Sequence, residues 1–377
     1  MRRRWYLFRP FDLIARLWPV RTPRRGLLIV HPNGLGDMIL LNPFIERYAR
    51  VFGLERSEIT LLGCSKWQPL AARIFAGCRV IGIDKLAYTR NVGYRFKTNV
   101  MVRRLAPASA VCAIFIRRNL EADSLVWITG APDRILTRPH TGARQADEQA
   151  WYLKRATQVV DHGPDTVHEL VRHNHFLDTL EGRERPLPPI RLDWPKHPSV
   201  SFDFQDRPYV VLHPVGDSFV QRWPMDRYVA LARRIRDRLG LKVVFMGKKG
   251  EAPLNRPVPA EPGLVDLIDA TSLPDAVDLL KGAALVVSND SGPAHMAIFL
   301  GTPLVVVKGG RHFRMYFPYP LGVTRAPISV VYEEMPCFGC FWGCRHADRD
   351  PNPWKPFPCI TAITLDRVWE AVERLTR

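Results

Sequence analysis

The feature that most constrains this chain is an alternation of short apolar runs with amphipathic stretches, which occurs twice along its 377 residues. GLLIV at 26–30, TLLGC at 60–64 and VVLH at 210–213 have the length of buried strands, and segments with helical spacing of apolar residues follow them. Strands that alternate with helices form parallel sheets with crossover helices. The sequence therefore predicts an α/β fold made of Rossmann-like halves.

A proline-rich segment separates the two stretches of this alternation. Residues 183–208 contain six prolines and show no helical period, which is typical of a linker or a domain edge. The chain of 377 residues also has the length of two ordinary domains. We expect a first Rossmann-like domain at 26–190 and a second at 208–377, preceded by a separate segment at 1–25. A ligand would then lie in a cleft between the domains.

The first 25 residues are strongly basic and aromatic. They hold eight arginines and one aspartate, so they carry seven of the 17 net positive charges of the chain. Aromatic residues interleave with the arginines: Trp5, Tyr6, Phe8, Phe11 and Trp18. The apolar stretches here do not form a signal-peptide core, and nowhere in the chain do 18 apolar residues follow one another. Two interpretations stay open: a basic arm in solution, or a segment that lies in the interface of an anionic membrane.

The sequence HPNGLGDM at 31–38 follows a predicted strand and opens a predicted helix. Gly34 and Gly36 allow the backbone to approach a ligand, and a helix N-terminus attracts anions. The spacing is not that of a dinucleotide fingerprint, because Ile39 stands where the third glycine is needed, and no Walker loop is present. Two interpretations remain for Asp37: a functional carboxylate at the end of the sheet, or an aspartate that only caps the helix.

Three loops of the second half also follow predicted strands and carry hydroxyls, glycines and charged side chains. In HPVGDSFVQRWP, Ser218 and Arg222 suit a phosphate, and in FMGKKGE, Glu251 can accept a hydrogen bond from a ribose. The third loop, SNDSGPAH, contains Asp290, Ser291, Gly292 and His295. We expect these groups to bind a nucleotide diphosphate rather than to stabilise the core, although a lone histidine is more often structural.

In order and spacing, these blocks resemble those of the bacterial heptosyltransferases, glycosyltransferase family nine. The resemblance rests on LLIVHPNGLGDMILLNPFIERY, VVLHPVGDSFVQRWPMDRYVALARRI, VVFMGKKGE and LPDAVDLLKGAALVVSNDSGPAHMAIFLGTPLVVV. It runs from about residue 26 to the C-terminus and is weak between about 65 and 205. It implies a GT-B fold of two Rossmann-like domains facing across a cleft, with the acceptor in the first domain and a nucleotide sugar in the second.

The resemblance also implies roles for matching residues. Asp37 corresponds to the proposed general base, and we expect the backbone of Gly36 beside the donor. Glu251 corresponds to the acid next to the adenosine ribose. Many members carry a lysine two residues before the tryptophan; here that position is Gln221, so we expect Arg222 to contact the phosphate instead. The block that contacts the donor corresponds to Asp290, Ser291, Gly292 and His295.

The expected activity is an inverting transfer of a heptose from an ADP-heptose-like donor to a lipopolysaccharide core or a related glycan. Asp37 would take the proton of the acceptor hydroxyl, while Arg222 and the helix after Ser291 would stabilise the departing diphosphate. Catalysis would then require no cofactor or metal. The one Asp-x-Asp sequence, Asp348-Arg349-Asp350, lies in a cysteine-rich segment away from the sheet ends. We expect a cytoplasmic protein, peripheral on the inner face of the cytoplasmic membrane.

Alternatives to this activity stay open. The same fold could use another nucleotide sugar or a protein acceptor. The net charge of +17 could instead indicate a nucleic-acid-binding protein, but the excess is concentrated in the first 25 residues and no nucleic-acid-binding motif occurs. The expected partners are therefore a nucleotide-sugar donor, a glycolipid or glycan acceptor and an anionic membrane surface, with no nucleic acid.

Four of the seven cysteines lie close together near the C-terminus, in the segment 337–359. They are Cys337, Cys340, Cys344 and Cys359. Four thiolates could hold a structural Zn or Fe ion. The spacing does not match a standard zinc ribbon, so the alternative is that the thiols simply pack.

Overall fold

The chain divides into two compact units, and each is described by itself. In the computed structural model, unit 1 comprises Met1–Pro188 and unit 2 comprises Pro189–Arg377. The boundary lies inside the proline-rich segment. The structure describes residues 2–115, 120–138, 146–164, 166–195, 207–216, 219–248, 257–341, 343–346 and 355–377.

Unit 1 is built on a six-stranded parallel sheet with the strand order β3-β2-β1-β4-β5-β6. Leu27 of β1 pairs with Ile59 of β2 on one side and with Ser109 of β4 on the other. The chain runs from β1 outward to β3 and then returns to β4 on the other side, so a topological switch point lies between β1 and β4. The strands are β1 (Leu27–His31), β2 (Ile59–Cys64), β3 (Arg79–Ile83), β4 (Ser109–Cys112), β5 (Asp133–Thr137) and β6 (Gln158–Val160).

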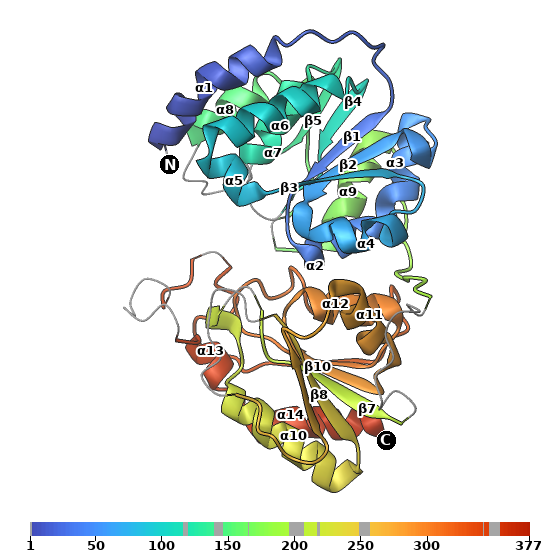
Figure 1. Cartoon of the computed structure of the whole chain (residues 1–377), viewed down its shortest axis with the longest axis vertical. Helices are drawn as coiled ribbons and strands as arrows, with labels where there is room; N and C mark the ends of the chain where they lie inside the picture. The colour runs from blue at the N-terminus through green and yellow to red at the C-terminus, as the bar shows by residue number, and fades with distance from the viewer. Residues whose placement is uncertain are drawn as a thin grey trace. The chain divides into compact units, whose positions relative to one another are not determined.

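Helices cover both faces of this sheet (Figure 1). Every residue of β1 and of β4 is buried, which explains why these strands read as nearly continuous apolar runs. The α-helices of unit 1 are α1 (Arg2–Arg16), α2 (Leu35–Leu41), α3 (Ile45–Phe52), α4 (Gln68–Ile74), α5 (Lys85–Arg90), α6 (Val92–Arg104), α7 (Leu120–Thr129), α8 (Ala146–Leu153) and α9 (Glu169–Glu181).

Unit 2 repeats this architecture with the strand order β12-β11-β10-β7-β8-β9, again with all strands parallel. Its switch point lies between β7 and β10. The strands are β7 (Tyr209–His213), β8 (Lys242–Gly247), β9 (Leu264–Ile268), β10 (Leu285–Asn289), β11 (Leu304–Val307) and β12 (Ile328–Val331). The α-helices are α10 (Met225–Leu239), α11 (Leu273–Gly282), α12 (Gly292–Leu300), α13 (Pro358–Thr361) and α14 (Leu365–Thr376).

The expected fold class of two Rossmann-like halves is confirmed, with one local difference. The periodicity from Ile39 to Phe52 predicts one helix, but the structure has α2 and α3 with a 3-10 turn, Asn42–Phe44, between them. Pro43 lies in that turn and has no backbone N–H to donate to the preceding turn of a helix. The apolar residues keep their helical spacing on both sides of this turn, so the pattern alone could not reveal the turn.

The N-terminal segment is not a separate arm, because its helix α1 packs on α6 and α7 of unit 1. Asp12 is almost fully buried and accepts hydrogen bonds from Arg95 Nε (2.7 Å) and Asn99 Nδ2 (2.7 Å), both on α6. Arg95 also donates to Ser124 Oγ of α7 at 2.9 Å. One buried ion pair therefore ties three helices together.

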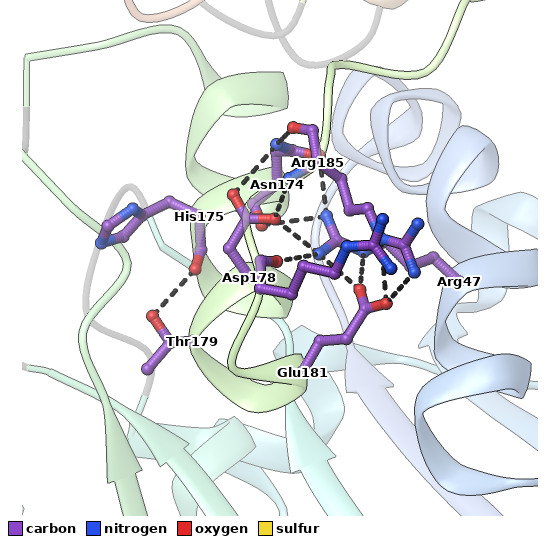
Figure 2. A network of polar contacts seen from close by, with 8 residues as sticks. Arg47, Asn174, His175, Asp178, Thr179, Glu181 and Arg185 are labelled. Carbon is purple, nitrogen blue, oxygen red and sulfur yellow. Dashed lines mark hydrogen bonds and ion pairs between the residues drawn. The ribbon is translucent and has the colours of Figure 1, made fainter.

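A second polar network joins α3 to α9 (Figure 2). Arg47 of α3 is buried, and its guanidinium contacts Asn174 Oδ1 at 2.8 Å, Asp178 Oδ1 at 2.5 Å and Glu181 Oε2 at 2.8 Å. Hydrogen bonds from Arg185 and Arg47 lower the pKa of Glu181 to about 2. This network fixes α9, which contributes side chains to the site below.

Within the ranges that the structure describes, no helix combines the length and the apolar character needed to cross a membrane.

Candidate active site

The loop that carries Asp37 is held at the carboxyl end of β1. Gly34 precedes α2 in an extended conformation, and its backbone N–H donates to Asp37 Oδ2 at 3.2 Å. The buried Trp67 donates from Nε1 to the carbonyl oxygens of Asn33 (3.0 Å) and Gly34 (3.2 Å). Asp37 and Gly36 lie half-buried in the first turn of α2. The loop thus presents a carboxylate at the switch point of unit 1.

His31, the last residue of β1, bridges this switch point. Its Nδ1 lies 2.5 Å from the carbonyl oxygen of Ala113, which directly follows β4. A carbonyl oxygen only accepts, so Nδ1 carries the proton and Nε2 of the neutral ring has a lone pair. Burial lowers the pKa of His31 against the opposing charge of Asp37. No hydrogen-bond partner of Nε2 lies among the described residues.

Helix α9 adds three buried polar side chains to the same region. Glu169 Oε2 lies 3.7 Å from Arg172 Nη1, and Glu169 Oε1 lies 3.9 Å from His173 Nε2. His173 stacks on Phe44 with ring centroids 5.1 Å apart, and its ring lies 6.0 Å from that of His31. All three side chains of α9 are at most 2% exposed.

Burial changes the acidity of Glu169 and of His173. It raises the pKa of Glu169 to about 8, with Arg172 opposing the shift and the charge of Asp37 adding to it. Burial also holds the pKa of His173 well below its usual range. A buried acid that keeps its proton at neutral pH beside a half-exposed aspartate is a common arrangement at acid–base sites. We call Asp37, His31, Glu169 and His173 the unit 1 site.

In unit 2, the side chain of Asn289 joins the loops that follow β7 and β10. Its Oδ1 accepts from the backbone N–H of Trp223 at 2.8 Å, and its Nδ2 donates to the carbonyl oxygen of Pro214 at 3.1 Å. Arg222 is largely buried and donates from Nε to the carbonyl oxygen of Gly216 at 2.9 Å. These contacts shape the loop after β7 next to the start of α12.

Ser291 precedes α12 in an extended conformation without capping the helix through its side chain. Its Oγ instead lies 3.1 Å from Ser288 Oγ and 3.2 Å from His213 Nδ1. Burial, and then the charge of Arg222, lowers the pKa of His213 to about 3, so this ring is neutral. Pro293 has no N–H, and the backbone N–H groups of Ala294 and His295 donate to the carbonyl oxygen of Ser291 at 3.1 and 3.3 Å, so this helix start offers an anion the N–H of Gly292 and the positive end of the helix dipole.

Asp290 is held by a buried lysine. Lys308, which follows β11 and is fully buried, donates to Asp290 Oδ2 and to the carbonyl oxygen of Arg311. His295 Nε2 lies 3.8 Å from Asp290 Oδ1. Burial alone would raise the pKa of Asp290, but the charges of Lys308 and His295 hold it below its usual value.

His295 is part of the interior rather than of the surface. It is 3% exposed, its Nδ1 lies 2.6 Å from Tyr319 Oη, and its ring stacks on Phe317 at 4.9 Å. The structure therefore brings the predicted donor residues of the third loop together at the start of α12. We call Arg222, Asp290, Ser291, His295 and Lys308 the unit 2 site. The predicted donor residues Ser218 and Glu251 lie outside the described residues, and so does the sequence Asp348-Arg349-Asp350, for which no metal role was predicted.

The four clustered cysteines are free thiols, and Cys344 and Cys359 belong to the core of unit 2. Burial, and then the neighbouring Cys344, raises the pKa of Cys340 to about 11. Cys337 Sγ lies 3.7 Å from His346 Nε2. In the described part of the chain, no three His, Cys, Asp or Glu side chains are arranged to hold a metal ion. Cys340 packs against the same core, and the described residues do not support the metal site that the spacing allowed.

Sequence reasoning missed several residues of both sites. Lys308 follows the apolar run LVVV directly, so the rule that selected Asp290 at a strand end could also have selected it. Glu169 and His173 gave no such signal, since they lie on a helix in the region where the family blocks are weak. His31 is the first residue of the HPNGLGDM motif, and only its contact with Ala113 distinguishes it from the other residues of that motif.

Comparisons with known proteins relate the chain to a family and to a fold. Residues 126–340 match the model of glycosyltransferase family 9 (heptosyltransferase). A curated relative, lipooligosaccharide heptosyltransferase 2 of Haemophilus influenzae, is 31% identical over 138 residues, which cover 34% of this chain and 39% of that protein. The aligned part therefore spans less than half of the length of this relative.

Solved structures resemble the chain over almost its whole length. The E. coli ADP-heptose lps heptosyltransferase II is 19% identical, covers 93% of this chain and 98% of its own, and has a TM-score of 0.65. The family 9 glycosyltransferase of Veillonella parvula is 18% identical, with 95% and 99% coverage and a TM-score of 0.68. The iron-containing dodecameric glycosyltransferase TibC of enterotoxigenic E. coli is 17% identical, with 94% and 77% coverage and a TM-score of 0.57. At these identities the likeness shows the fold, which is the expected GT-B class.

Proposed function

Because this chain belongs to glycosyltransferase family 9, the heptosyltransferase family, we propose that it transfers a heptose from an ADP-heptose-like donor to a lipopolysaccharide core or a related glycan. The transfer inverts the anomeric configuration and uses no metal ion. The acceptor binds at unit 1 and the nucleotide sugar binds at unit 2.

Asp37 is the general base of this proposal. It lies at the switch point of unit 1, where ligands bind in open parallel sheets, and its carboxylate is half-buried rather than enclosed. Asp37 takes the proton from the acceptor hydroxyl as that oxygen attacks the anomeric carbon. The bond from this carbon to the diphosphate oxygen breaks, and the diphosphate leaves with the electron pair. Direct displacement of this kind gives inversion.

The unit 2 site holds the donor in this proposal. The uncapped N-terminus of α12 attracts the diphosphate, and the loop shaped by Arg222 lies beside it. Asp290 orients the sugar, and its pairing with Lys308 keeps its charge from repelling the phosphates. The negative charge of the departing diphosphate is thus balanced by the N-terminus of α12 and by Arg222. This balance is the reason for proposing transfer without a metal ion. His295 supports Asp290 from the interior.

The observation that carries this proposal is the pair of equivalent switch points, one with a carboxylate and one with a helix N-terminus open to an anion. The test is a transfer assay with full-length protein, ADP-heptose and a water-soluble lipopolysaccharide core fragment, in the presence and absence of EDTA. Mass spectrometry should find a product one heptose heavier, and NMR should find the inverted anomer. Transfer from a different nucleotide sugar, or only to a protein acceptor, would replace the proposed substrates.

We also propose that the protein works in the cytoplasm at the inner face of the cytoplasmic membrane, where a glycolipid acceptor is presented. The basic character of residues 1–25 supports this location, because a net charge of +7 favours an anionic surface. Fractionation of cells that express the full-length protein tests the location. Recovery of the protein wholly in the membrane-free fraction would contradict it.

A further inference from the structure

Helix α1 has two different faces, and one of them is fully used inside unit 1. Phe8, Asp12 and Ala15 are buried and follow the helical spacing of four and three residues. Asp12 is paired with Arg95 of α6 and bonded to Asn99, so the rotation of α1 about its axis is fixed. The opposite face is therefore held outward on unit 1 (Figure 1).

That outward face is apolar. Of the ten large hydrophobic side chains that are exposed in the described part of the chain, six lie between residues 6 and 17. Their positions repeat at intervals of seven and eight residues, which places most of them on one side of a helix. We name this surface the α1 ridge, and its members are Tyr6, Leu7, Phe11, Leu13, Ile14 and Leu17.

The ridge is unusual for the surface of this protein. Leu17 is 80% exposed, Tyr6 66% and Leu7 62%. The other four exposed hydrophobic side chains of the described residues are scattered, from Leu86 to Leu321. Single exposed apolar residues need no explanation, whereas a continuous apolar stripe marks an interaction surface.

The surroundings of the ridge are positively charged. Residues 1–25 contain eight arginines, and the one acid, Asp12, is neutralised by Arg95. Arg9 stacks on Trp151 at 3.8 Å from the ring centroid, so this arginine also holds the helix in place. Arg21 and Arg25 are exposed just beyond the helix. A partner of the ridge must therefore be apolar in part and negatively charged in part.

We propose that the α1 ridge is a membrane-docking surface that lies in the headgroup region of an anionic lipid bilayer. A bilayer offers apolar depth for the leucines and negative charge for the arginines at once. A second copy of the chain fits less well, because its own residues 1–25 would bring a second net charge of +7 against the first. This inference deepens the proposed location but does not depend on the transferred sugar.

The test uses full-length protein with vesicles that contain phosphatidylglycerol in phosphatidylethanolamine. The double variant Leu7→Asn with Leu17→Asn should reduce the bound fraction at least about tenfold, because two exposed anchors lose their apolar depth. The double variant Arg21→Gln with Arg25→Gln should weaken binding about fivefold per residue, as expected for about 1 kcal/mol each. Leu321→Asn, which changes a fully exposed leucine of unit 2, is the matched control and should bind as the unaltered protein does.

Several outcomes would overturn the proposal. One is equal vesicle binding by the Leu7 and Leu17 double variant and the control. Another is equal binding to vesicles that lack anionic lipid. A third is a change from dimer to monomer in that double variant, measured by light scattering, with vesicle binding unaffected, since a second copy would then cover the ridge. Transfer to a water-soluble core fragment should be the same in all variants, so a failure here leaves the proposed activity standing.

Discussion

Lys308 and Asp290 form a buried ion pair between the carboxyl ends of β11 and β10. The two strands are neighbours in the sheet, with Val307 paired to Asn289, so the residues that follow them meet above the same edge. The pair anchors Asp290 of the loop SNDSGPAH to the fully buried Lys308. We expected these polar groups to bind a donor rather than to stabilise the core, whereas this pair predicts a stabilising role for Asp290 as well.

Asp290→Asn should destabilise unit 2 as well as weaken donor binding. The substitution leaves the buried ammonium of Lys308 without its counter-charge, which typically costs about 3–5 kcal/mol. Asp290→Asn combined with Lys308→Met removes both charges and should recover much of the stability but not the affinity for the nucleotide sugar. Urea unfolding and calorimetry with ADP and with the intact donor separate these effects. If Asp290→Asn unfolds at the urea concentration of the unaltered protein, the pair is not important for folding.

Asp37→Asn should abolish most of the transfer without unfolding unit 1. The loss should be about 10²–10⁴-fold in kcat, the usual contribution of a positioned base. The amide can still accept a hydrogen bond from the Gly34 N–H, so the melting temperature should change little. Single-turnover rates with bound donor report the chemical step. A variant within a few-fold of the normal rate would exclude Asp37 as the base.

Glu169 should make the stability of the protein fall as the pH rises. Its pKa of about 8 in the folded state lies above the 4.5 of an exposed glutamate, so the folded protein retains a proton that the unfolded chain releases. The stabilisation is complete below about pH 4.5 and is lost as the pH rises through about 8.

Glu169→Gln keeps the group neutral at every pH and isolates this effect. The variant should gain stability relative to the unaltered protein between pH 5 and 8, as measured by urea unfolding at each pH. His31 and His173 are present in both proteins, and burial lowers the pKa of each below its usual value. A difference that does not vary over this range would show that Glu169 ionises normally.

Arg47→Met should destabilise unit 1 by about 3 kcal/mol, because it removes a buried cation from two acidic partners and from Asn174. The matched control is Arg233→Met, which breaks an ion pair with Glu261 on the surface and should change stability little. Thermal unfolding of both variants provides the comparison. Equal melting temperatures would contradict a structural role for the network around Arg47.

Removal of residues 1–25 should lower the melting temperature of unit 1. The deletion takes Asp12 away from the buried guanidinium of Arg95 and uncovers the helix faces on which α1 packs. A deletion therefore cannot test membrane binding cleanly, whereas substitutions on the α1 ridge can. Differential scanning calorimetry of the truncated chain should show the loss. An unchanged melting temperature would mean that α1 contributes no stability.

The chain order of the elements explains which parts of the sites could be predicted. The sequence indicated Asp37, Arg222, Asp290 and Ser291, because each lies in a loop that follows an apolar run. Such loops meet at one edge of a sheet when the strands are parallel. Lys308 directly follows the apolar run of β11, so the same rule could have predicted it. The segment of α1 was interpreted from its charge and aromatic content, and such content does not show that Asp12 is buried.

The sequence by itself determined the alternation of strands and helices, the division into two Rossmann-like halves and the strand-end positions of the candidate groups, because all of these depend on local periodicity. Tertiary structure decided which groups meet. Glu169 lies near Asp37 because α9 packs against α2, although more than a hundred residues separate them in the chain. Lys308 reaches Asp290 because β11 pairs with β10. Such contacts, and the pKa shifts that burial then produces, depend on sheet order and helix packing, which no local pattern contains.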